Sequence, residues 1–389
     1  METDRKVLYF TRYLPAYRIP VFNKLNTELN GRLVVCAGQT PTQSSVLVSD
    51  DLSGREFEQI SLVSRFWKGD KIHFQNYHPA FEKYPTPAVV LAEESPRSIS
   101  LPFLLREAKK RDAGRALWGV FYSVHREYSG SHPLQYYRIQ MADRVEACAC
   151  YTRGVRDSLL PYVDPAKLFV AQNTLDTDQL FPLYDAMKKE GQASVRKSLQ
   201  IGVDEAVFVF SAMLVKRKGT RELLDIFGRI QAERPATLLV MGSGPELEPM
   251  KLIVEQKRLK NVRFLGSVPL LKDSAPYFFA ADMALIPGYV GLVANHALCL
   301  GVPLVTMEAP GKLPFHGPEI ESIVDGYNGF ISERNLDDLE NKVRALLSER
   351  SVFSENAIKY AREHITLDRM VGGLTGAINY AWQNRASRS

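Results

Sequence analysis

Short apolar runs rich in β-branched residues alternate with amphipathic segments along the whole chain. In the first half, the runs that predict strands lie at 7–10, 33–38, 88–93, 116–123, 144–151 and 168–173. In the second half, they lie at 207–213, 237–243, 262–266, 283–288 and 303–307. Regular alternation of strands and helices is typical of doubly wound parallel sheets with helices on both faces. The pattern therefore predicts the α/β fold class.

The polar stretch 181–205 separates the two series of strands and predicts an interdomain connection. The domains on either side are then Rossmann-like, at 1–180 and 206–367. Apolar residues at four-residue steps predict a further helix over 368–389 that closes a core, with the N-terminal domain as its candidate partner. Ligands of such sheets bind at the carboxyl ends of the strands, so we expect a site in a cleft between facing domains.

The length of 389 residues accommodates two ordinary domains with full cores. The formal net charge is only +5, and the basic residues are spread over both halves. This balance gives no reason to expect a nucleic-acid partner. The basic segment 106–115 is most often a solvated helix end, although it also suits contact with anionic lipid.

The four cysteines lack the spacing of a metal site and lie in or beside apolar segments; they are Cys36, Cys148, Cys150 and Cys299. We expect buried free thiols in a reducing cytoplasm and no bound metal. The charged start of the sequence does not resemble a secretion signal. Glycines and prolines divide the uncharged run 283–307, which favours strand, loop, helix and strand over a membrane span.

A basic turn follows the predicted strand 207–213 and includes Lys218 and Gly219. It opens a helix at Thr220, and a helix N-terminus with a neighbouring lysine suits a phosphate group. The alternative is a solvated turn in which Thr220 is an ordinary helix cap. From these residues alone, both interpretations stay open.

Two further turns also lie between a strand and a helix. The first consists of Gly242, Ser243 and Gly244 before a proline. Its glycines allow a ligand to approach the backbone closely, but the pattern is weak evidence and an ordinary turn is the favoured interpretation. In the second, amides near Gly291 and Leu292 begin a short helix and suit a diphosphate. His296 lies one turn further along that helix, where it contacts either the ligand or only the core.

In the first half, the segment after strand 7–10 carries Arg12, Tyr17 and Arg18. An arginine in such a loop can hold phosphate or carboxylate, while the tyrosines alternatively pack against the next helix. His125 follows strand 116–123 and is a candidate general base or partner of an acceptor hydroxyl. Its alternative role is a hydrogen bond to the backbone.

The ordered segments SAMLVKRKG, LLVMGSGPE, NVRFLGSVP, AADMALIPG, GLVANHALCLGVPLV and GPEIESIVDGYNGFI resemble glycosyltransferase family 4. The resemblance covers about residues 143–345 and is loose in the first hundred residues. It implies the GT-B fold, in which two Rossmann-like domains face each other, and retaining transfer from a nucleotide sugar. The sugar donor is then a co-substrate, and no cofactor is implied.

The resemblance also implies roles for individual residues. Lys218 would contact the diphosphate, and the backbone at Gly266 and Val268 would hold the base. Gly291 and Leu292 would offer amides to phosphate, while His296 would face the ribose or the diphosphate. Glu319 would lie near the same site, with no role assigned. His125 is loosely similar to a first-domain histidine that contacts sugar or acceptor.

The sequence departs from the family at two points. Ala212 and Met213 stand where members commonly carry an arginine before the lysine, and Gly288 and His296 replace two glutamates. The second departure resembles a bacterial subgroup with a PG-x-x-GL…H pattern, so we expect a variant site rather than a lost one. The catalytic candidates are accordingly Lys218, His296 and His125.

The favoured function is hexosyl transfer from a nucleoside diphosphate sugar to a saccharide or lipid-linked saccharide, in bacterial surface polysaccharide or glycoconjugate synthesis. A cytoplasmic enzyme, with contact at the inner membrane face left open, fits this function. One alternative is a sugar-nucleotide epimerase or hydrolase of the same fold. A second is a non-catalytic descendant that binds a nucleotide sugar.

Overall fold

The computed structural model describes residues 4–38, 54–68, 72–123, 132–311 and 315–385. Within these ranges the chain divides into two compact units. The N-terminal unit comprises the described residues up to Leu175 together with those from Leu367 onward. The C-terminal unit comprises Asp176–Thr366. Each unit is an α/β domain around one parallel sheet, so the predicted fold class is confirmed.

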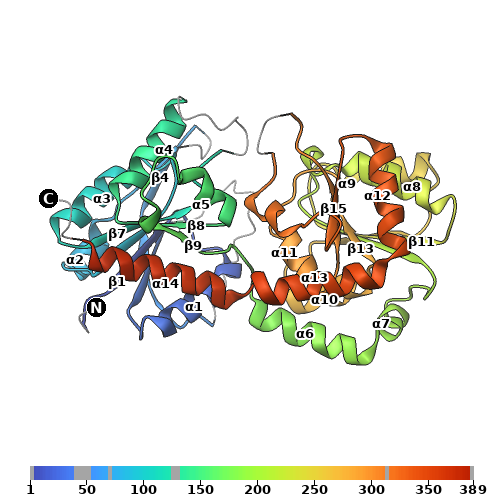
Figure 1. Ribbon diagram of the computed structural model, residues 1–389, viewed down its shortest axis with the longest axis horizontal. Coiled ribbons are helices and arrows are strands. Elements are labelled where there is room, and N and C mark those ends of the chain that lie inside the picture. The colour runs from blue at the N-terminus through green and yellow to red at the C-terminus, as the bar shows by residue number, and fades with distance from the viewer. Residues whose placement is uncertain (1–3, 39–53, 69–71, 124–131, 312–314, 386–389) are drawn as a thin grey trace. The chain divides into compact units, whose positions relative to one another are not determined.

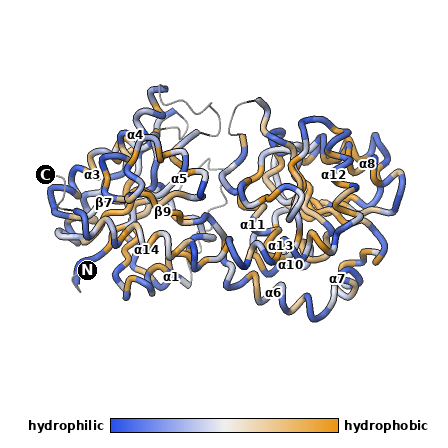
Figure 2. The backbone as a smooth tube through the Cα atoms, viewed as in Figure 1, coloured by the Kyte–Doolittle hydropathy of each residue, from blue (hydrophilic) through white to orange (hydrophobic). Residues whose placement is uncertain are grey.

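The sheet of the N-terminal unit has seven parallel strands (Figure 1). In spatial order they are β3 (Glu58–Leu62), β2 (Leu33–Gly38), β1 (Val7–Thr11), β6 (Val89–Glu93), β7 (Gly114–Gly119), β8 (Ala147–Cys150) and β9 (Leu168–Val170). Neighbouring residues of β1 enter different cores, with Val7 and Tyr9 in one and Leu8 and Phe10 in the other. This period of two explains why β1 is apolar along nearly its whole length. Figure 2 shows the apolar colour concentrated on the strands.

The helices of this unit are α1 (Ile19–Glu28), α2 (His78–Lys83), α3 (Leu101–Lys110), α4 (Pro133–Arg144) and α5 (Arg153–Leu159). An antiparallel hairpin of β4 (Ser64–Trp67) and β5 (Ile72–Gln75) stands beside the sheet. The last helix, α14 (Leu367–Gln383), packs against α1, β7, β8 and β9. Backbone approaches closely here, because a Cβ at Gly114 would collide with the carbonyl group of Ala381.

The sheet of the C-terminal unit has six parallel strands. In spatial order they are β12 (Val262–Gly266), β11 (Ala236–Met241), β10 (Ala206–Ser211), β13 (Met283–Leu285), β14 (Leu304–Met307) and β15 (Gly329–Ser332). The helices are α6 (Thr177–Glu190), α7 (Gln192–Ser198), α8 (Thr220–Gln231), α9 (Leu247–Gln256), α10 (Leu271–Ala280), α11 (Val293–Cys299), α12 (Leu336–Ser348) and α13 (Arg350–His364). Figure 1 shows them on both faces of the sheet.

The stretch 181–205, which we expected to be a connection, contributes two helices to the C-terminal unit. In α6 the polar residues face solvent, while Leu180, Tyr184 and Met187 are buried. The ring centroid of Tyr184 lies 5.8 Å from that of Phe279 in α10. The high polarity of this stretch therefore reflects one exposed helix face rather than an extended connection.

Four strands escaped the sequence pattern, namely β3, β4, β5 and β15. Most residues of β3 and β4 are partly or fully exposed, so their apolar signal is weak. In β5, polar His73 and Gln75 occupy the buried positions, which inverts the expected pattern. Hydrophobic periodicity identifies strands with buried apolar residues and misses strands that are largely exposed or whose buried positions are not apolar.

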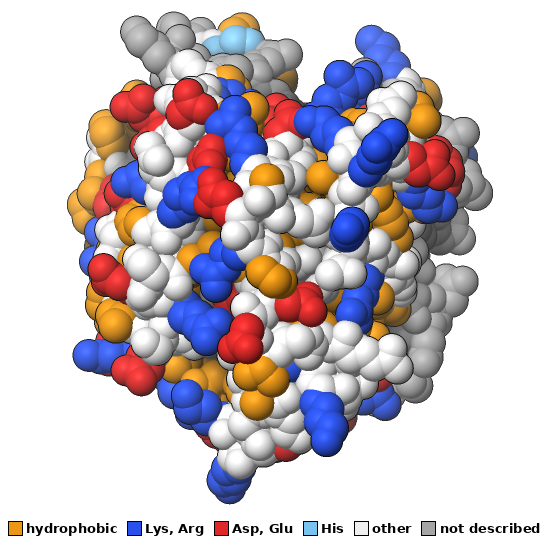
Figure 3. Space-filling model, turned by 90° about the vertical axis from the view of Figure 1, so that its right-hand side faces the viewer, with side chains coloured by type: hydrophobic (Ala, Val, Ile, Leu, Met, Phe, Trp, Pro, Cys, Tyr) orange, Lys and Arg blue, Asp and Glu red, His pale blue; other side chains and the backbone are white. Residues whose placement is uncertain are grey.

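The surface around α8 and α12 carries charges of both signs. Arg229 of α8 pairs with Asp337 and Glu340, and Arg344 of α12 pairs with Glu233. Figure 3 shows this side of the C-terminal unit, where blue and red side chains alternate. The four cysteines are buried and free, as expected. Among the described residues, no helix has the length and apolar character that crossing a membrane requires.

Candidate functional site

The candidate site of the C-terminal unit lies where the strand order of its sheet reverses, between β10 and β13. Loops after neighbouring strands separate at such a point, and ligands of doubly wound folds bind there. The loop after β10 contains η3 (Lys216–Lys218), and the loop after β13 leads into α11. Two backbone hydrogen bonds join them: Gly288 N donates to Lys218 O at 3.1 Å, and Tyr289 N donates to Arg217 O at 2.8 Å.

Glycine is required on both sides of this junction. Gly219 has φ +74°, the left-handed region, and a Cβ there would lie 2.7 Å from Gly288 N. A Cβ at Gly288 would collide with Arg217 O and with the carbonyl carbon of Lys218. The position at which the resemblance leads one to expect a glutamate therefore has no room for any side chain.

Lys218 occupies the centre of the junction and is only 9% exposed. Its Nζ donates to Tyr289 O at 2.8 Å and lies 4.6 Å from the centroid of the same tyrosine ring. The guanidinium carbon of Arg217 lies 4.5 Å from that ring. Burial lowers the pKa of Lys218 to about 8; Arg217 adds to the effect, and Glu319 opposes it.

Glu319 is the carboxylate of this site. It belongs to η4 (Pro318–Ser322) and is only 4% exposed. Burial first, and then the charge of Glu319, raise the pKa of Tyr289. Because Glu319 also acts on the pKa of Lys218, the acidic and basic groups of the site are electrostatically coupled.

His316, which the sequence pattern did not single out, fixes the loop after β13. Val290 N donates to its Nδ1 at 3.1 Å, and its Nε2 lies 3.0 Å from Met307 O. These partners assign the neutral form with the proton on Nε2. Burial lowers the pKa of His316 to about 4, which keeps the ring neutral. The sequence feature that could have identified His316 is its position directly before the GPEIES segment.

His296 lies in α11 and packs against Phe278 of α10, with the ring centroids 4.3 Å apart. Its Nε2 is buried and has no hydrogen-bond partner, and burial lowers its pKa to about 4. This geometry fits the core role that the sequence left open. A contact of His296 with ribose or diphosphate stays a prediction.

The turn Gly242–Gly244 packs directly on the loop after β10. Leu214 N donates to Ser243 O at 2.9 Å, and Glu246 N donates to Leu214 O at 3.0 Å. A Cβ at Gly242 or Gly244 would collide with backbone of residues 212 to 214. Close packing against this backbone therefore explains why both positions are glycine. Gly266, at the exposed end of β12, has open space around it, and Val268 is half-buried, so base contacts there stay predictions.

The N-terminal unit separates the residues predicted for the acceptor side. Arg18 is buried, where its Nη2 donates to Asn173 Oδ1 at 2.7 Å and its guanidinium carbon lies 4.7 Å from the Trp118 ring centroid. Tyr17 is partly exposed beside it, in a recess with Glu93. Arg12 lines a second recess on the other side of Glu93. His125 lies outside the described residues.

Comparison with known proteins agrees with this arrangement. Residues 192–364 match the family described as Glycosyl transferases group 1. An uncharacterized glycosyltransferase of Methanocaldococcus jannaschii is 26% identical over 190 residues. That alignment covers 46% of this chain and 46% of the relative, so the chain spans about half the length of the curated relative it matches.

Solved structures match over nearly the whole chain. HepE of Anabaena, in complex with UDP, has a TM-score of 0.71 at 14% identity and covers 96% of this chain and 99% of its own. A glycosyltransferase of Rickettsia africae has a TM-score of 0.72 at 12% identity, covering 98% and 99%. The lipopolysaccharide outer core galactosyltransferase WaaB, in its apo form, has a TM-score of 0.65 at 13% identity, covering 96% and 99%.

The fold defines the class: each unit is Rossmann-like, and the structural neighbours have the GT-B architecture that the resemblance implied. Residues 192–364, the stretch that matches Glycosyl transferases group 1, lie within the C-terminal unit, in agreement with glycosyltransferase as the predicted class. The subgroup with glycine and histidine in place of the glutamates stays a prediction.

Proposed function

We propose that this protein transfers a sugar from a nucleoside diphosphate sugar to an acceptor hydroxyl, with retention of the anomeric configuration. The observation that carries the proposal is the buried Lys218 at the junction of two glycine-dependent loops. A charged lysine is costly to bury, and an anionic ligand would add to the stabilisation that Glu319 and Tyr289 O already give Lys218. The diphosphate of the donor has the required charge.

The donor binds at the strand reversal of the C-terminal unit. Lys218 and Gly219 contact the diphosphate, with amides at Gly291 and Leu292 as further donors. Gly242, Ser243, Gly244, Gly266 and Val268 lie on the side of the base. UDP is the first candidate nucleotide, because the neighbouring HepE structures hold UDP and UDP-glucose.

Catalysis is electrostatic in this proposal. Lys218 stabilises the negative charge that develops on the leaving diphosphate, while Arg217 supplies a second cation where the family arginine is missing. Glu319 holds Lys218 in its charged form and is a candidate partner for a donor hydroxyl. We assign no protein nucleophile, because the departing phosphate can itself take the proton of the acceptor. His125 and His296 keep their predicted roles as candidates.

The acceptor binds the N-terminal unit, near Arg12 and Tyr17. Arg18 supports that region from the interior. The acceptor is a saccharide or a lipid-linked saccharide of a bacterial surface polysaccharide or glycoconjugate. Contact with the inner face of the membrane is compatible with the basic end of α3, where Lys109 and Lys110 lie.

The test is thermal-shift binding of UDP, GDP, dTDP and CMP to the wild type and to Lys218→Ala. A ligand that binds only the folded state raises the melting temperature by mass action. We expect one nucleotide to stabilise the wild type and to have little effect on the variant. Lys216→Ala, an exposed lysine of the same turn, is the matched control and should respond like the wild type.

A non-catalytic binding protein is the second candidate function. The lack of space for a glutamate at Gly288 and the buried, uncharged His296 favour it. An assay of donor hydrolysis and transfer, with the sugar product identified by chromatography, distinguishes the transferase from the binding protein. Nucleotide binding without any turnover against a broad acceptor set would favour the binding protein, and turnover of donor alone into an altered sugar nucleotide would indicate an epimerase.

A further inference from the structure

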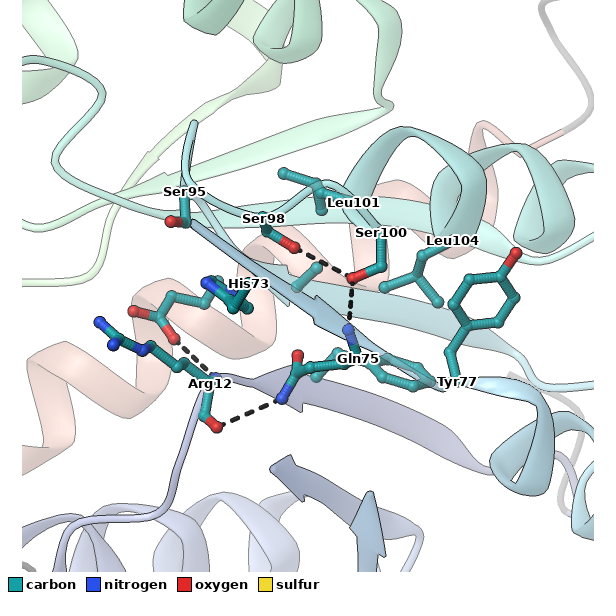
Figure 4. Close-up of a pocket in the computed structure, with 12 residues that line it drawn as sticks. Arg12, His73, Gln75, Tyr77, Ser95, Ser98, Ser100, Leu101 and Leu104 are labelled. Carbon is teal, nitrogen blue, oxygen red and sulfur yellow. Dashed lines mark hydrogen bonds between the residues drawn. The ribbon is translucent and has the colours of Figure 1, made fainter. Parts of the chain in front are cut away.

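A polar recess opens to solvent on the N-terminal unit at the strand reversal between β1 and β6. Its walls are β5, the ends of β1 and β6, the loop 95–100 and the first turn of α3 (Figure 4). Arg12, His73 and Gln75 line it together with three serines, Ser95, Ser98 and Ser100. The recess is distinct from the donor site, which belongs to the other unit.

His73 is the unusual residue of this recess. It is only 2% exposed, yet its Nδ1 has no hydrogen-bond partner. Its backbone is fixed on both sides, since His73 N donates to Arg97 O and Ile99 N donates to His73 O, each at 2.9 Å. A buried polar atom without a partner is costly, and native proteins keep few of them. The wall of the recess therefore holds an unused hydrogen-bonding group.

The recess is electropositive at His73. After burial, the charges that lower its pKa are those of Arg12 and Arg97. Ser100 is the N-cap of the ten-residue helix α3, whose dipole and first amides favour an anion. Glu93 is the carboxylate of the lining, but its Oε2 already accepts from Thr11 Oγ1 and Arg12 N, both at 3.0 Å.

The serine hydroxyls of the lining can reorient toward an anion. The hydroxyls of Ser98 and Ser100 lie 3.2 Å apart and hydrogen-bond each other, so either can rotate to donate elsewhere. Gln75 is fixed by donating its side-chain amide to Thr11 O at 2.8 Å, and its backbone N donates to Ser100 Oγ at 3.2 Å. Figure 4 shows these side chains converging on one space.

We propose that this recess binds a negatively charged group of the acceptor, a carboxylate or a phosphate, through His73, Arg12, a serine hydroxyl and the N-terminus of α3. The inference rests on the proposed function and narrows it, because it makes the acceptor an acidic saccharide or a phosphorylated one. The recess sets which acceptor is chosen, whereas the donor site sets the reaction.

The experiment is calorimetric titration of the full chain with D-glucuronate, inorganic phosphate and D-glucose. All titrations use the Lys218→Ala variant, so that anion binding at the donor site does not contribute to the signal. The result therefore stays interpretable even if the proposed donor site is wrong. We expect glucuronate or phosphate to bind and glucose to bind at least tenfold more weakly. Binding of glucuronate alone indicates a uronate-bearing acceptor, and binding of phosphate alone indicates a phosphorylated one.

His73→Phe removes the nitrogens and keeps a ring of similar size, so it should weaken binding of the anion at least tenfold. The exposed His364→Phe in the other unit is the matched control and should leave it unchanged. Ser98→Ala is the second variant if His73→Phe does not fold, and it should weaken binding about threefold. Equal binding of glucose and anions, no binding of either anion, or full binding by a folded His73→Phe or Ser98→Ala would overturn the proposal.

Discussion

The two units reverse their strand order in the same way but fill the reversal with different groups. In the C-terminal unit, backbone meets backbone at Gly219 and Gly288, and one buried lysine lies at the contact. In the N-terminal unit, side chains fill the equivalent place, with Arg18 among aromatic rings and Glu93 between two recesses. The comparison teaches that close backbone packing constrains the proposed phosphate site, whereas the proposed acceptor region is built from side chains.

Among these substitutions, Gly288→Ala should have the largest effect, because it disrupts the backbone contact that distinguishes the C-terminal unit. The added methyl group would collide with backbone of the loop after β10, so the two loops must separate and Lys218 loses its place. We expect nucleotide affinity to fall about 100-fold or more, on the order of 3 kcal/mol. Titration with the nucleotide identified by thermal shift measures it. Gly372→Ala, in open space on α14, is the control and should keep full affinity.

Arg18→Ala tests the N-terminal unit, where we expect a loss of stability without a loss of nucleotide affinity. The substitution removes a buried side chain from its ring contacts and leaves Asn173 Oδ1 without this donor, so the unfolding free energy should drop by about 3 kcal/mol. Nucleotide affinity should not change. Urea unfolding followed by tryptophan fluorescence reports the loss, and the exposed Arg106→Ala is its control. If the variant instead keeps its stability but binds the acceptor more weakly, Arg18 contacts the acceptor.

The pH dependence of nucleotide binding sharpens the role of Lys218. Its pKa of about 8 means that the cation is present below pH 8 and is lost as the pH rises through that value. A diphosphate prefers the cation, so affinity should decline above pH 8, approaching about tenfold per pH unit. Lys218→Arg keeps its charge in this range, and its profile should be flat. The same decline in both proteins would show that another group is responsible.

Glu319→Gln should have the smallest effect. The carboxylate raises the pKa of Lys218, so its removal lets that pKa fall further below 8 and moves the decline in affinity to lower pH. At neutral pH we expect the affinity to fall about two- to threefold, because a smaller fraction of Lys218 then carries its charge. The pH profile of nucleotide binding is the measurement. Glu321→Gln, an exposed carboxylate of the same 3-10 helix, should leave the profile in place.

The sequence predicted the buried strands and the class of fold because each follows from a local rule. An apolar run marks a strand, and regular alternation of strands and helices marks a doubly wound sheet. The contact of Lys218 with phosphate stays a prediction. The sequence missed β5 and the recess around His73, since a buried polar position in a strand reads as an exposed one. It did not predict the burial of Arg18, because no local pattern distinguishes an arginine in a loop from one enclosed by Trp118 and Asn173. The acceptor-side role of Arg18 stays a prediction.

His296 shows a different limit. Its position in the helix was correct, but the direction of its ring depends on Phe278, far away in sequence. Likewise, the need for glycine at position 288, where the resemblance leads one to expect a glutamate, follows from the backbone of Arg217 that lies against it. Contacts between distant segments decide such cases, and a single sequence does not contain them.

The placement of α14 has a consequence for synthesis on the ribosome. Its apolar residues, among them Met370, Leu374 and Ile378, belong to the same core as Val7 and Tyr9 of the first strand. The ribosome must therefore translate the entire C-terminal unit before this core can close. Until then the nascent N-terminal unit keeps an apolar groove uncovered, which makes it a natural client for chaperones during translation.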